Sequence, residues 1–183
     1  MSNIGAFVNV SLDGFFAGPN GEIDWFKAIR KSDDFDAYTR GAAKSGSTLL
    51  FGRTTYEMMK SYWTTPEAAQ ADAHMTDVMR NSKKIVISRT LKSVEETPAW
   101  KNVELRRDIG DFASDDSVTI LGSGSIVQQL ANRNLVDQFQ LVVVPLILGA
   151  GKPLFKNVKK IDLTLQNARS FSNGLVVLTY RPA

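Results

Sequence analysis

Short apolar runs alternate with amphipathic segments along the first two thirds of the chain. Each run ends at glycine or at a polar turn, which is typical of strands that are covered on both faces of a sheet. We predict such strands at residues 4–12, 48–51, 84–88, 103–106 and 118–121.

The amphipathic segments between these runs predict helices. Ser32 or Asp33 can cap the first helix, which ends before Gly46. Further helices are predicted at 54–61, at 66–80 and directly after residues 122–125. Because strands and helices alternate here, the sheet should be largely parallel.

The last third of the chain follows a different pattern. Residues 138–147 form a long strand-like run that is interrupted at Pro145. Two further runs, 163–171 and 175–181, flank Ser172-Asn173-Gly174, and an Asn-Gly pair between alternating runs is a strong hairpin signal. The sheet should therefore finish with antiparallel strands.

Length and composition indicate one soluble α/β domain over residues 1–183, with a mixed, mostly parallel sheet and a C-terminal antiparallel hairpin. Apolar residues make up 43% of the chain, and no run approaches the ~18 apolar residues of a membrane span. With no cysteine and only His74, no metal site is predicted. The absence of a secretory signal favours a cytoplasmic location.

The charge pattern gives no reason to expect a nucleic-acid or membrane partner. The net charge is +3, and basic residues are scattered, whereas a nucleic-acid-binding domain would carry a continuous basic stripe. Lys83-Lys84 and the lysines of residues 156–160 form short clusters, which we expect on solvated faces.

The strongest local signal for chemistry is a glycine-rich turn between a predicted strand and a helix. The turn is Gly122-Ser123-Gly124-Ser125, and Ile126 follows it. Glycines let a pyrophosphate approach the backbone, and the helix N-terminus favours an anion. The motif is neither G-x-G-x-x-G nor a P-loop, and alone it could be a tight strand-to-helix connection.

Two other predicted strand ends carry similar chemistry. Arg53, Thr54 and Thr55 follow Gly52, although they could simply form a capped helix start. The third strand end carries Ser88-Arg89. Ligands of open α/β sheets bind outside the carboxyl ends of the strands, and two arginines suit a 2′-phosphate. Together the three strand ends predict a binding site for a phosphorylated nucleotide.

These segments, in their order and spacing, resemble the dihydrofolate reductase superfamily across nearly the whole chain. Ser11-Leu12-Asp13-Gly14 and residues 144–151 resemble the branch that contains the reductase domain of riboflavin-biosynthesis deaminase-reductases. The resemblance implies a three-layer fold with about eight strands that binds NADPH. A deaminase half would need zinc ligands that the chain lacks.

The resemblance also implies positions for the cofactor. Residues 52–55 and Ser88-Arg89 would hold the 2′-phosphate, and residues 122–126 would hold the pyrophosphate. The backbone near Asn9 and Ala17 would meet the nicotinamide. The glycine-rich loop from Asp13 to Asp24 would act as a mobile lid.

The substrate side is less defined. Dihydrofolate reductases place one carboxylate in the pterin pocket, and the candidates here are Glu22, Asp24, Asp33 and Asp34. We select Asp24 as the proton donor because the apolar pair beginning at Trp25 could contact an aromatic substrate and raise the pKa of the carboxyl group. A surface carboxylate at Asp24 is an equal alternative.

Two other side chains have candidate roles near the substrate. Asp13 is a second catalytic candidate that could instead brace the turn at Gly14. Lys152 could bind a phosphate group of the substrate.

The resulting hypothesis is an NADPH-dependent reductase of a pterin-like or ribosylated aminopyrimidine substrate. The alternative is a non-catalytic NADP-binding module that keeps the phosphate loops without the acid. Apolar runs in the last strands also favour a homodimer, although an intramolecular core would explain them as well.

Overall fold

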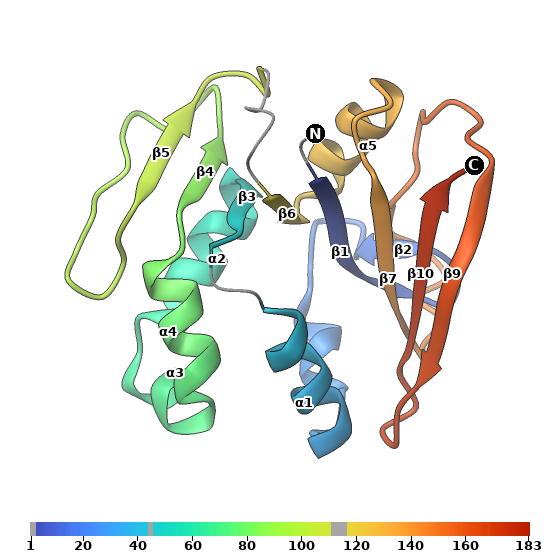
Figure 1. Ribbon diagram of the computed structural model, residues 1–183, viewed down its shortest axis with the longest axis horizontal. Helices are drawn as coiled ribbons and strands as arrows, with labels where there is room; N and C mark the ends of the chain where they lie inside the picture. The colour runs from blue at the N-terminus through green and yellow to red at the C-terminus, as the bar shows by residue number, and fades with distance from the viewer. Residues whose placement is uncertain (1–2, 44–45, 111–116) are drawn as a thin grey trace.

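The computed structural model describes residues 3–43, 46–110 and 117–183, and its centre is an eight-stranded sheet (Figure 1). Its strands are β1 (Asn3–Ser11), β3 (Thr48–Gly52), β4 (Lys84–Ile87), β5 (Val103–Arg106), β6 (Ser117–Gly122), β7 (Gln138–Val144), β9 (Leu163–Ser170) and β10 (Val176–Pro182). They lie in the order β5-β4-β3-β6-β1-β7-β10-β9. The first six pair in parallel and the last two are antiparallel, which confirms the predicted sheet.

Helices cover both faces of this sheet. They are the 3-10 helix η1 (Asp24–Ala28) and the α-helices α1 (Asp33–Ala42), α2 (Arg53–Trp63), α3 (Pro66–Ala71), α4 (Ala73–Asn81) and α5 (Gly124–Asn132). Successive strand residues face opposite sides. In β3, Leu50 packs in the core that includes Ile126 of α5, whereas Leu49 and Phe51 pack in the core that includes Tyr56 of α2. The domain therefore has three layers.

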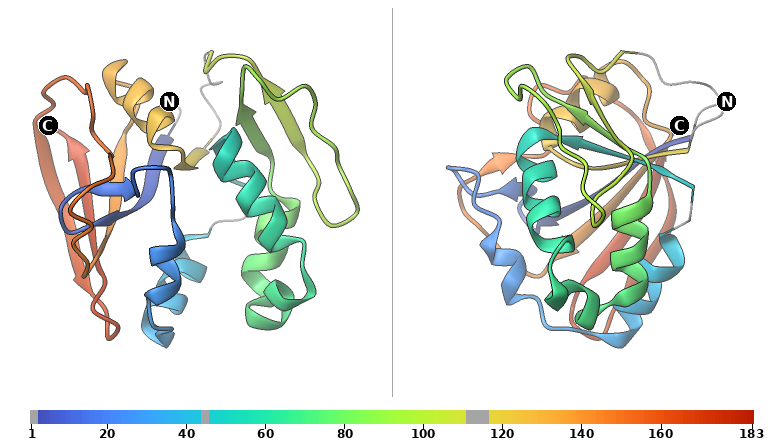
Figure 2. Two further views of the ribbon diagram at one scale, coloured as in Figure 1. Left: turned by 180° about the vertical axis from the view of Figure 1, so that it is seen from behind. Right: turned by 90° about the vertical axis from the view of Figure 1, so that its left-hand side faces the viewer.

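Two groups of helices share the face of the sheet opposite α5. The aromatic residues Phe35 and Tyr38 of α1 pack near Phe171, next to the C-terminal strands. Helices α2 and α4 instead pack with β3 and β4. The ribbons of α1 and of α2 to α4 accordingly lie apart on this face (Figure 2).

The first strand shows how the sequence positions residues for this face. Ile4, Ala6 and Val8 are buried in the core against α5. The residues between them point the other way, so Phe7 and Asn9 face the space between the helix groups.

The C-terminal hairpin forms as predicted. Phe171 donates its backbone N–H to the carbonyl of Leu175, and Gly174 donates to the carbonyl of Phe171. Gly174 has φ +86°, a conformation that glycine adopts without a steric penalty. The turn therefore places β9 beside β10 at the edge of the sheet.

The prediction of one helix over residues 66–80 is wrong. The backbone leaves the helical conformation at Asp72, which separates α3 from α4. The Asp72 carboxylate accepts a hydrogen bond of 2.9 Å from the backbone N–H of Met75 and so caps α4. Aspartate favours such caps because its side chain competes with the helical backbone for hydrogen bonds.

A small second sheet was not predicted. Strand β2 (Phe15–Ala17) pairs antiparallel with β8 (Lys152–Pro153). Both strands are too short to show periodicity in the sequence. Their pairing fixes the loop after β1 against the segment after β7.

The prediction that Lys84 is solvated is also wrong, whereas Lys83 and the lysines at 156, 159 and 160 are exposed as expected. The Lys84 side chain is fully buried, and its ammonium group donates to the carbonyls of Arg80, Ser82 and Lys101 at 2.8 to 3.0 Å. These three acceptors replace water, which allows the charge to be buried.

No helix within residues 3–43, 46–110 and 117–183 is both long enough and apolar enough to cross a membrane.

Candidate functional site

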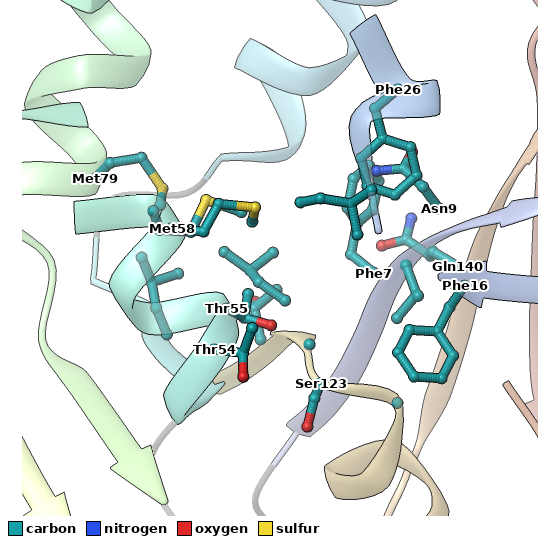
Figure 3. Close-up of a pocket in the computed structure, with 18 of the residues that line it drawn as sticks. Phe7, Asn9, Phe16, Phe26, Thr54, Thr55, Met58, Met79, Ser123 and Gln140 are labelled. Carbon is teal, nitrogen blue, oxygen red and sulfur yellow. The ribbon is translucent and has the colours of Figure 1, made fainter. Parts of the chain in front are cut away.

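A cavity of about 760 Å³ lies on the face of the sheet between α1 and the pair α2 and α4 (Figure 3). Its floor consists of residues from the central strands, including Phe7, Thr119 and Gln140. A second cavity of about 450 Å³ adjoins it at the carboxyl ends of the parallel strands. Thr54, Ser123 and Ser125 line both cavities, so the two are neighbouring parts of one site.

Two glycines allow the turns after β3 and β6 to approach one another. A Cβ atom at Gly52 would lie 2.7 Å from Oγ of Ser123, and one at Gly122 would lie 3.0 Å from Oγ1 of Thr55. Gly122 also has φ +126°, which residues with a side chain rarely adopt. The two turns therefore pack closely together, and their junction, at which Gly52 lines the smaller cavity and Gly122 the larger one, is called the cradle.

The two helices that begin at this cradle differ from the other α-helices of the described ranges. Ser32, Thr65 and Asp72 cap α1, α3 and α4 through their side chains. Helices α2 and α5 begin without a side-chain cap. Their N-terminal N–H groups and helix dipoles are thus directed at the shared boundary of the cavities, as in anion-binding sites.

The smaller cavity is rich in arginine. It is lined by Arg53, Arg89 and Arg107, together with Asp108. Arg53 donates to Glu57 at 2.9 Å and to Thr90 at 3.1 Å. Among the described residues, Arg89 has no hydrogen-bond or ion-pair partner, so its guanidinium group is available to a ligand.

The side chains of Ser88 and Arg107 stabilise the wall of the smaller cavity through hydrogen bonds to backbone groups. The Ser88 hydroxyl accepts hydrogen bonds from the N–H groups of Thr90 and Leu91. Arg107 donates to the carbonyls of Ser88, Leu91 and Lys92. Arg107 was not predicted, because it follows β5 without a glycine or hydroxyl that would mark it as a site residue.

The predicted cofactor residues are thus brought together. Gly52, Arg53, Ser88, Arg89 and Ile126 line the smaller cavity, and Asn9, Ala17, Thr55, Gly122 and Gly124 line the larger one. The Phe16 ring, which was not predicted, packs on Gly124, where a Cβ atom would come within 2.4 Å of the ring. Phe16 therefore contacts the start of α5 from β2.

Amide side chains lie on the sheet side of the larger cavity. Gln140 donates a hydrogen bond of 3.1 Å to the hydroxyl of Tyr38, which holds its amide group in place. Asn9 lines the same region from β1, beside Phe26 of η1 (Figure 3). The sequence analysis predicted a role for the backbone near Asn9 but none for its side chain. Gln140 was not predicted, because a polar residue in a strand usually faces solvent.

The opposite wall is formed by methionines. Met58 and Met59 of α2 and Met75 and Met79 of α4 all line the larger cavity, and Figure 3 shows Met58 and Met79 across from Asn9 and Gln140. The sequence contains five methionines, so four of them meet at this wall. That clustering was a signal in the sequence, but helical spacing alone is also typical of a core.

The carboxylate candidates lie outside this lining. Of the described residues that line the larger cavity, none is acidic. Asp24 is exposed at the start of η1. Its neighbour Trp25 is 9% exposed and packs in a core with Val142 and Phe171 rather than in the cavity.

Asp34 and Asp13 both hold loops together. Asp34 accepts hydrogen bonds from Ser32 and from the backbone N–H and hydroxyl of Ser172, which keep its pKa well below the ordinary value. Asp13 accepts from the hydroxyl of Ser11 and from the N–H groups of Leu148 and Gly149. The Ser11 hydrogen bond is the main reason that the pKa of Asp13 is lowered.

Lys152 reaches the larger cavity from β8. Its ammonium group lies 3.2 Å from the position of a Cβ at Gly21, in the predicted lid. The pKa of Glu22 is lowered mainly by its own backbone N–H and by Asn20, and the charge of Lys152 contributes. Lys152 thus lies near an acidic partner at the lid.

Comparisons with known proteins agree with this arrangement. The model of the RibD C-terminal domain matches residues 111–177. YyaP of Bacillus subtilis (strain 168), an uncharacterized protein, is 30% identical over 174 residues, which are 93% of this chain and 90% of YyaP. YwjB, a second uncharacterized protein of the same bacterium, is 25% identical over 170 residues, which are 92% of each chain.

Two crystal structures share the fold. One is from Shewanella sp. PV-4, of a protein assigned to riboflavin biosynthesis, with a TM-score of 0.75 and 22% identity over 100% of this chain and 99% of that one. The other is a diaminohydroxyphosphoribosylaminopyrimidine deaminase/5-amino-6-(5-phosphoribosylamino)uracil reductase of Thermotoga maritima, with a TM-score of 0.67 and 16% identity over 100% of this chain and 57% of that one. The predicted dihydrofolate-reductase-like fold is confirmed.

Proposed function

Because the chain belongs to the family of YyaP and has the fold of RibD C-terminal reductase domains, we propose that it is an NADPH-dependent reductase of a small heterocyclic substrate. The observation that carries the proposal is the pair of uncapped helix N-termini at the boundary between an arginine-lined cavity and an apolar one. A dinucleotide with a charged end and a flat, weakly polar end matches that pairing.

The residues present fit such a cofactor. The cradle at Gly52 and Gly122, which line the two adjoining cavities, would hold the pyrophosphate with the N–H groups of α2 and α5. Arg53 and Arg89 would hold the 2′-phosphate, for which a guanidinium fork is well suited. When bound, NADPH supplies a hydride to a carbon of a C=N or C=O bond, and an acid of the protein, directly or through water, supplies the proton for the heteroatom.

The substrate candidates are a pterin-like ring and a ribosylated aminopyrimidine. The second is suggested by the activity of the Thermotoga maritima relative. Asp24, which precedes the cavity residue Phe26 by two positions, is our candidate proton donor, and Asp13 braces the predicted lid.

Binding of the cofactor can be tested directly. Trp63 lines the larger cavity, so its fluorescence should change on titration with NADPH. We expect a dissociation constant in the micromolar range for NADPH and one at least about tenfold higher for NADH. Binding of NADPH no tighter than about millimolar would contradict the proposal.

Arg89 should provide much of this selectivity. Arg89→Ala should weaken NADPH binding about tenfold or more and leave NADH binding nearly unchanged, since only NADPH carries the extra phosphate. Arg181→Ala, at an exposed position on β10, is the matched control and should change neither affinity. An equal loss of affinity for NADPH and for NADH would contradict the role of Arg89 in binding the 2′-phosphate.

A non-catalytic NADP-binding module is the second candidate function. It is favoured by one observation, the lack of an acidic residue among the described residues that line the larger cavity. Oxidation of NADPH in a screen with dihydrofolate and the riboflavin-pathway pyrimidine would argue against it. Asp24→Asn should then lower turnover while NADPH affinity stays unchanged, and unchanged turnover would show that Asp24 is structural.

A further inference from the structure

The charges around the two cavities are unevenly distributed. Three arginines line the smaller cavity, whereas Lys152 is the single cation among the described residues that line the larger one. Lys152 lies beside the lid residues Gly21 and Glu22, and the Glu22 carboxylate offsets part of its charge. Outside the cradle that we assign to the cofactor's pyrophosphate, a phosphate on the substrate would therefore find little compensation in the larger cavity.

The wall formed by α2 and α4 is chemically distinct from the rest of the site. The thioethers of Met58, Met59, Met75 and Met79 line it. Methionine side chains are polarizable and flexible, and their sulfur atoms make favourable contacts with aromatic rings. Burying an anion against them would cost free energy, because they cannot donate hydrogen bonds to it.

The sheet side offers directional polar groups. The amides of Asn9 and Gln140 lie opposite the methionines, and the hydrogen bond to Tyr38 occupies one N–H of Gln140 and leaves the other for a ligand (Figure 3). Two such amides can hold a carbonyl oxygen or a ring nitrogen without any charge.

We propose that the larger cavity binds a flat, uncharged, conjugated ring compound that carries a carbonyl group and no phosphate. Its oxygen accepts hydrogen bonds from Asn9 and Gln140, and its ring lies against the methionine wall. This inference rests on the proposed function, since it names the substrate class of the same site. It favours the pterin-like class over the ribosylated, phosphorylated class.

The test compares ligands that differ in charge but share a ring. Isothermal titration calorimetry with the full chain measures binding of 1,4-naphthoquinone and of 1,4-naphthoquinone-2-sulfonate. 5-Amino-6-(5-phosphoribosylamino)uracil is the phosphorylated competitor. We expect the uncharged quinone to bind at least about tenfold more tightly than either anion. Equal or tighter binding of the anions would overturn the inference.

NADPH binding is measured separately, so the two proposals can fail independently. If NADPH binds and the phosphorylated pyrimidine binds more tightly than the quinone, the inference on substrate class is overturned while the reductase proposal stands. If the quinone binds with the expected preference and NADPH does not bind, the ligand class is supported and the reductase proposal fails.

Variants of the methionine wall give an independent measurement. Met58→Lys should reduce the preference for 1,4-naphthoquinone over its sulfonate at least about tenfold, because the new cation can pair with the anion. Ser61→Lys introduces the same charge at an exposed position of α2 outside the cavity lining and should leave the preference unchanged. The same change of ligand preference in both variants would show that the ring does not bind against the methionine wall.

The amide contacts are tested with a matched pair on β7. Gln140→Ala should weaken quinone binding about tenfold through the lost hydrogen bond, with NADPH affinity unchanged. Gln138→Ala changes the same residue type two positions away, outside the cavity lining, and should have no effect. Circular dichroism confirms folding, and unchanged quinone binding in folded Gln140→Ala would overturn the role of Gln140.

Discussion

At the scale of single residues, Lys84 illustrates what burial does to a charge. Burial lowers the pKa of the fully buried Lys84 to about 8 from an ordinary value of 10.5. Its ammonium group also lies 4.4 Å from the centre of the Trp100 ring. The sequence could not predict this environment, because an adjacent lysine pair before a strand looks like a solvated cluster.

The lowered pKa predicts how stability depends on pH. Between about pH 8 and 10.5 the unfolded chain binds the Lys84 proton and the folded chain does not, so the free energy of unfolding rises with pH. The contribution is at most about 1.4 kcal/mol per pH unit. Urea unfolding from pH 7 to 9.5 should show a smaller rise in Lys84→Met than in the native chain. Identical pH dependence in both would refute this.

Gly122, which the sequence singles out as a phosphate-binding residue, lines the larger cavity in a left-handed conformation. Gly122→Ala should destabilise the protein by about 1 to 3 kcal/mol, because φ of +126° strains any residue with a Cβ atom, and it should also weaken NADPH binding. Gly41→Ala is the control, since its Cβ would meet nothing within 4 Å inside α1, and it should stabilise by up to about 1 kcal/mol. Thermal unfolding with and without NADPH measures both effects.

The residues of the candidate site differ in how far the sequence alone could locate them. Glycines, arginines and hydroxyls at strand ends carry a local signal, so Gly52 and Arg89 could be located from the sequence alone. Gln140 and the methionine wall depend on which face of the sheet and of α2 turns towards the cavity. That orientation follows from tertiary packing and leaves no motif in the sequence.

At the scale of elements, the strands and long helices could be predicted because their periodicity is strong. The predicted strand at 103–106 coincides with β5, and the glycine-rich turn leads into α5 as expected. The elements that were missed are short: β2, β8, η1 and the division at Asp72. Hydrogen bonds from a single side chain or from a distant segment decide such elements, and a periodicity argument cannot detect them.

The loop after β1 gives a prediction at this scale. Asp13→Ala removes the acceptor for the N–H groups of Leu148 and Gly149, so these amides should exchange with solvent at least about tenfold faster. Asp162→Ala removes an exposed carboxylate paired with Lys160 and should leave both amides unchanged. Hydrogen exchange measured by NMR reads each amide separately. Unchanged exchange in Asp13→Ala would show that other contacts hold the loop.

At the scale of the whole molecule, the arrangement of helices creates the site. Helix α1 packs with the C-terminal strands and α2 and α4 pack with β3 and β4, so the cavity opens over the central strands between them. Alternation of strands and helices predicts the parallel sheet, and the order of the strand ends predicts that their glycines, arginines and hydroxyls meet at one edge of it. The distance between two helix groups on one face is set by side chains from distant segments and was beyond prediction.

The edge of the sheet at β9 supports the proposal of a homodimer, which remains a prediction. Every residue of β9 is exposed, including Leu163 at 40% and Leu165 at 51%, and among the described strands only β10 pairs with β9. A long exposed edge with apolar side chains can pair with the same edge of a second copy about a twofold axis. Light scattering after size exclusion should therefore give twice the chain mass of 20.2 kDa.

Substitution at this edge should separate pairing from general surface effects. Leu165→Lys would remove an apolar contact and place a positive charge on the paired edge of each copy, so the dimer should dissociate at micromolar concentration while the fold is retained. Tyr62→Lys makes a similar change at an exposed apolar residue of α2, far from β9 in the order of the sheet, and should stay dimeric. A native chain that is monomeric at about 100 μM would exclude a dimer of micromolar affinity, since such a dimer would be mostly associated at that concentration.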